Sequence, residues 1–359
     1  MSKPKIFIGI IETGNFTLQL AQGLRELGYD VTNIVIRPKT QIISNKGHTR
    51  YIRNNHPFFL GYDIVKEFFR SIFSHDVFIF NYSTSFFGLL SYSKLTKFLS
   101  TIDLIILKKL GKKIIFLSSG SDTRSYELLI EDLKRKKLFS HAKYLERNLN
   151  NIISRKNYSN ISKRRTKIIE KYADHFFNQP NMAQFFTKNY HFFWVPIDLR
   201  NIEYKINNNQ IPIITHAPSK RALKGTSYVL DAIEKLKKEN YKFEFILCEN
   251  RPNEKVREAL SQSDIVIDQL LLPSYGLFGI EAMATGNAVL GSAVANYNNF
   301  PKELPIITTT PGNIYENLKK LIENPNLRIK LAKQGRQYVE KYHDHKKVTK
   351  DFLKKIDLS

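Results

Sequence analysis

Cysteine is almost absent from the sequence, and long apolar runs are missing. The single thiol, Cys248, cannot form an internal disulfide, which favours a reducing compartment. The first residues lead into only six mostly apolar positions before Glu12, too few for a cleavable secretion signal. No segment approaches the roughly 18 apolar residues of a spanning helix, since stretches such as 102–107 end in charges. We therefore expect a cytoplasmic protein that does not cross a membrane.

Glycine-rich nucleotide motifs are also missing. The first expected strand-to-helix loop, 9–15, has neither the three-glycine spacing of a dinucleotide fingerprint nor the Lys-Ser/Thr pair of a P-loop. This disfavours nicotinamide chemistry and P-loop hydrolysis. Gly14 and Asn15 are either turn residues or a place where a ligand approaches the backbone.

Carboxylates and histidines are not grouped at metal-ligand spacing. His343, Asp344 and His345 lie together, but in a terminal helical region where we expect them to be solvated. We expect no metal ion and no resident cofactor.

Positive charge, in contrast, is abundant. Lys and Arg number 56 against 33 Asp and Glu, a formal +23, while 42% of the residues are hydrophobic, so the chain is a folded protein and not a disordered polycation. Residues 1–200 hold 32 basic and 15 acidic residues, and 124–171 alone hold 14 and 5. That stretch, with its clusters 134–137 and 163–165, either faces anionic lipid or nucleic acid or is a solvated helical surface.

A nucleic-acid-binding protein is the less favoured alternative. The aromatic pairs Phe58-Phe59 and Phe68-Phe69 could stack on bases, but paired aromatics within helical or strand patterns are more typical of a core. We expect no nucleic-acid partner.

Apolar runs alternate with helical patterns along the chain. Short apolar runs predict these strands: 5–11, 31–36, 77–80, 113–117, 211–215, 243–247, 265–268 and 288–290. Helical periodicity between them predicts helices that include 64–72, 86–110, 225–240, 253–261 and 276–285. Such alternation predicts an α/β protein with two tandem Rossmann-like domains facing across a cleft.

The expected domains are an N-terminal domain at 1–200 and a C-terminal domain at 201–340. A terminal helix at 341–359 is expected to pack back on the first domain. The polar stretch 207–210 suggests a linker near 198–210.

Two expected strand-to-helix loops of the second domain contain residues suited to a nucleotide. His216, Arg221 and Lys224 follow the strand 211–215, with Gly225 at the start of the next helix. Parallel sheets bind ligands at the carboxyl ends of their strands, and Arg and Lys neutralise phosphate oxygens. We expect these cations to stabilise a diphosphate leaving group.

The second loop follows Asp268 and enters a small, apolar helix that contains one acid, Glu281. A buried carboxylate needs hydrogen-bond donors, which ribose hydroxyls would supply; a capping or packing role is the alternative. The N–H groups of Gly276 and Leu277, at the helix start, are expected to face a phosphate.

The block 263–289 resembles the donor-site signature of retaining, nucleotide-sugar-dependent glycosyltransferases of GT-B fold, in which two Glu residues are separated by seven positions. Residues 221–225 resemble the diphosphate-clamping segment of that family, and 110–124 and 335–338 resemble it more weakly. The resemblance implies metal-independent sugar transfer with retention, as in cell-surface polysaccharide biosynthesis. It also implies that the domain at 1–200 lies on the acceptor side and that the domain at 201–340 binds the nucleotide sugar.

Two positions depart from the family pattern. Pro273 stands where the family has its first Glu, and Ser119 where it commonly has a His. Asp268 or the region of Tyr275 is a candidate to compensate for the first. Donor binding survives these changes better than turnover, so a catalytically silent sugar-nucleotide-binding protein is the alternative function.

The expected site therefore has three parts. Arg221 and Lys224 are catalytic; Glu281, Gly276, Leu277, Tyr275, Asp268 and His216 bind the donor; Gly14, Asn15, Ser119, Asp122 and Arg124 contact the acceptor. The expected partners are a nucleotide sugar, linked to UDP or GDP, and a saccharide or lipid-linked acceptor. We also expect the basic N-terminal domain to face an anionic membrane surface from the cytoplasm.

Overall fold

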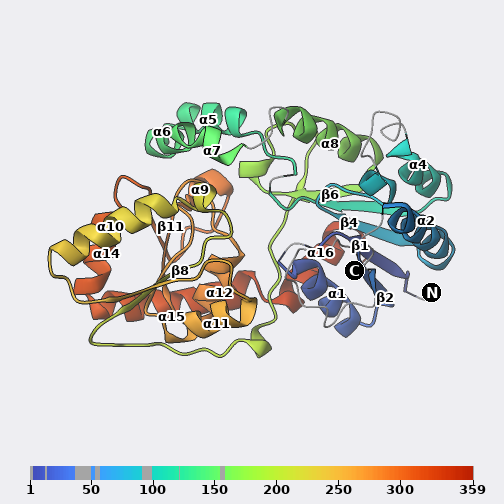
Figure 1. Ribbon diagram of the computed structural model, residues 1–359. Helices are drawn as coiled ribbons and strands as arrows, with labels where there is room; N and C mark the ends of the chain where they lie inside the picture. The colour runs from blue at the N-terminus through green and yellow to red at the C-terminus, as the bar shows by residue number, and fades with distance from the viewer. Residues whose placement is uncertain are drawn as a thin grey trace. The chain divides into compact units, whose positions relative to one another are not determined.

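The computed structural model describes residues 3–12, 14–36, 50–52, 57–90, 99–120, 122–153 and 158–358 (Figure 1). They form two compact units. The first contains Met1–Ser125, Ser159–Ile197 and His345–Ser359, and the second contains Tyr126–Tyr158 and Asp198–Asp344. Each unit has a parallel β-sheet covered by helices, which confirms the predicted class of two Rossmann-like α/β domains.

Within the described residues, the sheet of the first unit has seven parallel strands in the order β3-β2-β1-β4-β5-β6-β7. Their bounds are β1 Ile6–Ile10, β2 Val31–Ile36, β3 Arg50–Ile52, β4 Val77–Asn81, β5 Lys113–Leu117, β6 His175–Asn178 and β7 His191–Phe192. Strand β1 is buried along its whole length, as a central parallel strand covered on both faces must be.

Helices cover both faces of this sheet. They are α1 Phe16–Glu26, α2 Pro57–Ser74, α4 Ile102–Lys109, α8 Tyr158–Tyr172 and α16 His345–Lys355, with 3₁₀ turns η1 Phe87–Leu90 and η2 Pro180–Met182. Ile6 and Ile8 of β1 face α1 and α16, while Phe7 and Ile10 face α2, α4 and α8. Alternate side chains of one strand thus contribute to two cores. The helix expected at 86–110 is interrupted, and its part at 91–98 lies outside the described residues.

The sheet of the second unit has five parallel strands in the described part of the chain, in the order β12-β11-β10-β8-β9. The strands are β8 Ile213–His216, β9 Glu244–Leu247, β10 Ile265–Ile267, β11 Ala288–Gly291 and β12 Ile306–Thr308. The helices are α5 Tyr126–Arg135, α6 Phe139–Arg147, α7 Leu149–Ile152, α9 Arg221–Lys224, α10 Thr226–Lys238, α11 Asn253–Gln262, α12 Leu277–Thr285, α13 Ala295–Asn298, α14 Ile314–Glu323 and α15 Pro325–Tyr342, with the 3₁₀ turn η3 Leu199–Asn201. Apolar faces of α10 and α14 pack on the sheet.

Helices α5 to α7 belong to the second unit, although we expected residues 1–200 to form one domain. The reason is apolar contact: Leu129, Leu133 and Leu145 share a buried cluster with Leu271 and Leu272. The basic stretch 124–171 is therefore divided between the two units.

The segment expected as a linker is fixed to the second unit. The side-chain amide of Asn207 donates to the carbonyls of Ser261 and Ser263, both at 2.9 Å, and Asn209 donates to Asp264. These amides pair with groups of the second unit, and both residues are half-buried.

His343 and His345 are buried, each with 2% exposure, so the expectation that they are solvated was wrong. The ring of His343 contacts the hydroxyl of Tyr275, and that of His345 contacts the carboxylate of Glu26. Both rings are held in the interior by partners that lie far away in the sequence, so local sequence patterns could not predict their burial.

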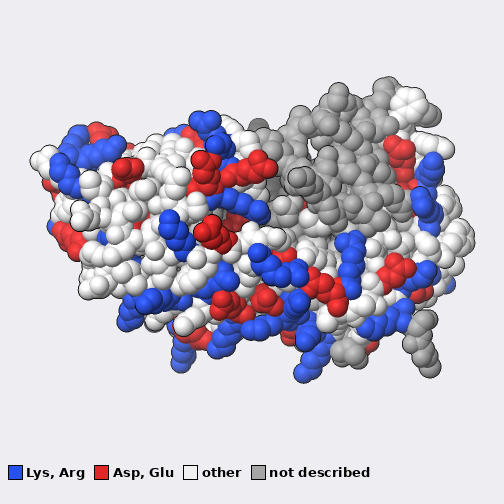
Figure 2. Space-filling model, turned by 90° about the horizontal axis from the view of Figure 1, so that it is seen from below, with Lys and Arg blue, Asp and Glu red and all other residues white. Residues whose placement is uncertain are grey.

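The aromatic pairs divide between core and surface. Phe68 is fully buried, whereas Phe69 and Phe59 are about half exposed; the side chain of Phe58 lies outside the described residues. On the face drawn in Figure 2, Lys and Arg are interspersed with Asp and Glu. No helix within the described residues has the length and apolar character to span a bilayer.

Candidate functional site

A buried ion pair lies at the carboxyl ends of β8 and β10. The ammonium of Lys224, at the end of α9, donates to Oδ1 of Asp268 at 2.6 Å, and the two side chains are 11% and 0% exposed. Asp268 immediately follows β10, so the strand delivers its carboxylate to the edge where open sheets bind ligands. The structure thus brings together one predicted catalytic residue and one predicted donor-binding residue.

Glycines make room for this carboxylate. The N–H of Gly276 donates to Oδ2 of Asp268 at 2.6 Å. A Cβ added at Gly279 would lie 2.9 Å from the same oxygen, and one at Gly276 would lie 3.2 Å from the Lys224 ammonium. Asp268 therefore occupies a niche that only small residues on α12 allow.

The first turn of α12 remains a source of donors beside this pair. Gly276 is the residue before the helix, and its N–H is taken by Asp268. The N–H groups of Leu277 and Phe278 have no acceptor within the helix, and both residues are partly exposed. Of the two amides predicted to face a phosphate, that of Leu277 has no acceptor within the helix, while that of Gly276 donates to Asp268.

Arg221 begins α9 and pairs with a different carboxylate. Its Nη1 donates to Oε2 of Glu249 at 2.5 Å, and the side chains are 55% and 24% exposed. Glu249 follows β9, the strand beside β8. Sequence reasoning missed Glu249; its position just after a strand was the available signal.

Glu281 is a half-buried acid on α12. Burial raises the pKa of its carboxyl group, and the positive charge of Arg257 opposes the shift. Within the described residues its carboxylate has no hydrogen bond or ion pair. A carboxylate in this state can accept hydrogen bonds from ligand hydroxyl groups.

His216 lies inside the second unit instead of lining a surface. It is fully buried; Nδ1 lies 2.8 Å from the carbonyl oxygen of Ile267, and Nε2 lies 3.0 Å from Oγ1 of Thr226. Burial lowers its pKa to about 4. A neutral ring then donates from Nδ1 and accepts at Nε2, which ties β8 to β10 and to the start of α10.

The side chain of Tyr275 is also directed into the unit. Its hydroxyl lies 2.9 Å from Nε2 of His343 and 3.3 Å from the hydroxyl of Tyr338, and its ring lies 4.7 Å from that of Phe300. Burial raises its pKa well above the usual value. Tyr275 thereby anchors the loop that ends at Gly276.

In the first unit, Gly14 and Asn15 form the turn between β1 and α1, with φ angles of 70° and 63°. The carboxylate of Glu12, which is fully buried, accepts hydrogen bonds from the hydroxyl of Thr17 and, at 3.2 Å, from the N–H of Leu18. Glu12 therefore supplies the negative charge that the N-terminus of α1 favours, a role that sequence reasoning missed.

Ser119 and Asp122 meet at the carboxyl end of β5. Asp122 is fully buried and accepts from Oγ of Ser83 at 2.6 Å and from the N–H of Ser119 at 3.0 Å. Burial raises its pKa, which nearby Arg165 opposes. Ser83 follows β4 with a φ of 51°, a strained conformation of the kind found at functional sites, and no sequence pattern indicated it.

Arg124 is buried, and its Nε donates to the carbonyl of Asn181 at 3.1 Å. The side-chain amide of Asn81 donates to the carbonyl of Ile11 at 3.1 Å, which links the ends of β1 and β4. The predicted acceptor residues other than Arg124 thus follow two strands, β1 and β5, that both pair with β4.

Among the described residues, no group of three His, Cys, Asp or Glu side chains could hold a metal ion.

No protein-family model and no curated protein matches the chain, but solved structures do. Sucrose-phosphate synthase from Thermosynechococcus elongatus is 13% identical over 98% of each chain, with a TM-score of 0.62. UDP-GlcNAc 2-epimerase from Neisseria meningitidis, bound to UDP-GlcNAc, is 12% identical over 99% of this chain and all of its own, with a TM-score of 0.56. TarM is 12% identical over 83% of this chain and 57% of its own, with a TM-score of 0.53.

Identities this low establish the fold alone. The chain has the GT-B fold, the architecture that the sequence predicts.

Proposed function

We propose that the chain is a glycosyltransferase that moves a sugar, with retention, from a nucleoside-diphosphate donor to a saccharide or lipid-linked acceptor, and that it needs no metal ion. The observation that carries the proposal is that α12 holds both unbonded N–H groups and an unpaired carboxylate. Its first turn leaves N–H groups of accessible residues without helical acceptors, and the same helix holds the unpaired carboxylate of Glu281. Amides for phosphate and an acid for ribose are what a sugar nucleotide requires.

The proposed reaction is a displacement at the anomeric carbon of the donor sugar. The bond from that carbon to the diphosphate oxygen breaks, and the acceptor oxygen bonds to the same carbon on the same face. The acceptor proton leaves with the diphosphate. Lys224, Arg221 and the N–H of Leu277 stabilise the charge that develops on the leaving group, an electrostatic contribution worth roughly 3 to 4 kcal/mol for a single well-placed donor.

Asp268 is proposed to hold Lys224 in place before the donor arrives. Its carboxylate lies 2.6 Å from both the Lys224 ammonium and the Gly276 nitrogen. Pro273 removes the acid that the family resemblance would place in this loop, and Asp268 keeps one carboxylate in it. His216 and Tyr275, proposed in the sequence analysis to bind the donor, then support the loops from within.

The first unit is proposed to bind the acceptor through Gly14, Asn15, Ser119 and Asp122. A lipid-linked acceptor would bring this unit to an anionic membrane surface on the cytoplasmic side. The base of the nucleotide, uracil or guanine, is left to experiment.

Glu281→Gln tests the proposal because it keeps the shape of the side chain and removes its charge. A panel of UDP and GDP sugars is measured by thermal shift, where a ligand at about 100 times its Kd adds roughly 2.7 kcal/mol to stability. Loss of one charge-assisted hydrogen bond, about 1.5 to 3 kcal/mol, should weaken binding of the best sugar nucleotide about 10- to 150-fold. Glu316→Gln, an exposed acid on α14, is the matched control. Equal affinity in both variants would exclude Glu281 from the site.

A sugar-nucleotide-binding protein without turnover is the second candidate, favoured by Pro273 and Ser119. Chromatographic analysis of the bound sugar nucleotide after incubation with and without acceptor separates the two. Release of free nucleoside diphosphate supports the transferase, and recovery of intact donor supports the binding protein.

A further inference from the structure

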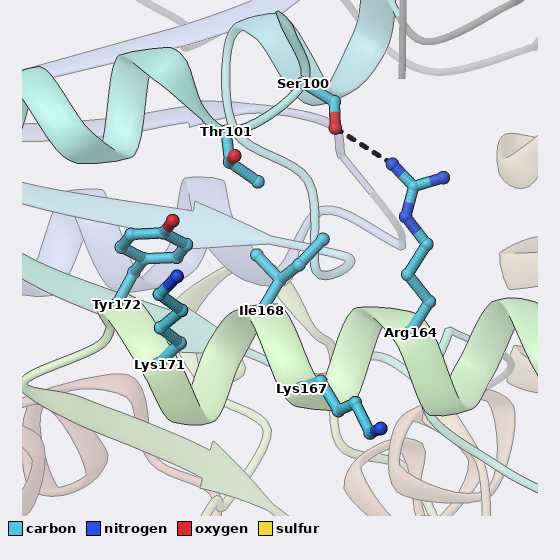
Figure 3. A pocket seen from close by; sticks show the side chains of 7 residues that line it. All are labelled: Ser100, Thr101, Arg164, Lys167, Ile168, Lys171 and Tyr172. Carbon is cyan, nitrogen blue, oxygen red and sulfur yellow. Dashed lines mark hydrogen bonds between the residues drawn. The ribbon is translucent and has the colours of Figure 1, made fainter. Parts of the chain in front are cut away.

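A pocket of about 380 Å³ lies in the first unit, and none of the residues proposed to bind the acceptor lines it (Figure 3). It is formed by α8 and by the two residues that precede α4, and it is lined by Ser100, Thr101, Arg164, Lys167, Ile168, Lys171 and Tyr172. Three of these seven side chains are cationic, and none is acidic.

The three cations share one stretch of α8. Lys167 is three residues from Arg164 and four from Lys171, spacings at which like charges on a helix repel each other. Lys167 and Lys171 have no ion pair among the described residues. An anion in the pocket would relieve this repulsion.

Neighbouring acids are committed to other partners. The carboxylate of Glu170 accepts from the N–H groups of Thr187 and Lys188 at 2.6 and 2.8 Å. That of Asp174 pairs with Lys108 and accepts from the N–H of Ile114 at 2.7 Å. Glu170 and Asp174 therefore bind groups outside the pocket lining and do not neutralise the cations of the pocket.

Two of the cations contact neighbouring side chains, one of them polar and the other aromatic. Nη2 of Arg164 donates to Oγ of Ser100 at 2.9 Å, and Ser100 is only 5% exposed. The Lys171 ammonium lies 5.2 Å from the centre of the Tyr172 ring, as Figure 3 shows. Ile168 and Tyr172 are half-buried. A fixed guanidinium suits phosphate oxygens, and the apolar side chains suit a carbon chain or ring.

Apolar side chains adjoin the lining residues. Leu99, next to Ser100, is 45% exposed, and Ile161, one turn before Arg164, is 37% exposed. Basic and apolar groups together are typical of surfaces that bind amphiphiles.

We propose that the pocket between α8 and the start of α4 binds the phosphate group of a ligand, with Arg164 and Lys171 as its main contacts. The ligand is either the headgroup of an anionic lipid or a soluble phosphate. The pocket is distinct from the proposed donor site, whose residues belong to the other unit.

The test compares the full-length wild type with Arg164→Gln/Lys171→Gln. A control, Lys109→Gln/Lys163→Gln, removes two exposed charges from the same helices without touching the pocket lining. Co-sedimentation is measured with phosphatidylcholine vesicles, with and without phosphatidic acid. Thermal shift is measured with inorganic pyrophosphate. Lys171→Gln alone repeats both measurements with a smaller change, and thermal unfolding without any ligand reports that each variant is folded.

Three outcomes are distinguished. If the ligand is a lipid headgroup, the pocket variant loses about 30-fold in binding to phosphatidic acid vesicles, at roughly fivefold per basic residue, and the control retains its binding. If it is soluble, pyrophosphate stabilises the wild type and the control but not the pocket variant, while vesicle binding is unchanged. Pocket and control variants that behave alike in both assays overturn the proposal.

Discussion

Replacing Asp268 by Asn should leave the Lys224 ammonium without a counterion. The Asn side chain keeps an oxygen for the N–H of Gly276, but it removes the negative charge that now lies 2.6 Å from the Lys224 ammonium. The resulting variant has a cation in a nearly closed environment with no counterion.

The magnitude follows from the burial of the pair. Breaking a buried ion pair by removing one partner costs about 3 to 5 kcal/mol. Because the Lys224 side chain is 11% exposed, some solvent reaches the ammonium, so we expect about 3 kcal/mol, at the lower end. The cost should appear as a lower free energy of unfolding in urea at neutral pH.

Ligand binding should return part of this stability. A diphosphate near Lys224 replaces the missing charge, so UDP or GDP should stabilise Asp268→Asn more than the wild type. The assay is urea unfolding of both proteins with and without each nucleotide. The wild type, in which Asp268 already neutralises Lys224, should gain less.

Glu249→Gln is the control, because it breaks a more exposed pair in the same unit. Exposed pairs contribute about 0 to 1 kcal/mol. If Asp268→Asn costs no more than Glu249→Gln, the buried pair does not stabilise the unit. If nucleotide stabilises Asp268→Asn no more than the wild type, Lys224 does not meet the diphosphate.

Two further predictions concern the same edge of the sheet. Burial lowers the pKa of His216 to about 4, against about 6.5 in the unfolded chain, so the unfolded chain takes up a proton first as the pH falls. The free energy of unfolding should therefore decrease by roughly 3 kcal/mol between pH 6.5 and 4. In His216→Asn, the free energy of unfolding measured in urea should change less over this pH range. Gly279→Ala should gain about 1 kcal/mol from helix propensity but lose more, because its Cβ would lie 2.9 Å from the firmly bonded Asp268 carboxylate. A net loss of about 1 kcal/mol is expected in thermal unfolding. Gly291→Ala is the control, because a Cβ there would have no contact under 3.6 Å and should be tolerated. Equal stability of the two variants would show that Gly279 is not needed to make room for the Asp268 carboxylate.

The fold could be predicted from the sequence because the signals are local. Strand β5 begins and ends where the apolar run 113–117 does, and α10 lies within the predicted 225–240. The placement of α5 and α6 could not be predicted, since it depends on contacts of Leu129 and Leu145 with residues more than a hundred positions away.

The candidate site was predictable in part for the same reason. Carboxyl ends of strands locate Lys224 and Asp268, because the chain alternates regularly between strands and helices. The pairing of Lys224 with Asp268 depends on the space that the glycines of α12 leave for the carboxylate and on the burial of both side chains. Residue spacing in the sequence indicates neither. His216 shows the converse: the sequence placed it at a strand end, but both ring nitrogens bind groups of the protein.

Glu12 makes the two halves of the molecule chemically unequal. In the first unit, the loop after the first strand contains a carboxylate that accepts hydrogen bonds from the following helix. In the second unit, the loop after β8 leads to Arg221 and Lys224. Under the proposed function, a diphosphate would meet a carboxylate at the former position and two cations at the latter, which favours donor binding in the second unit.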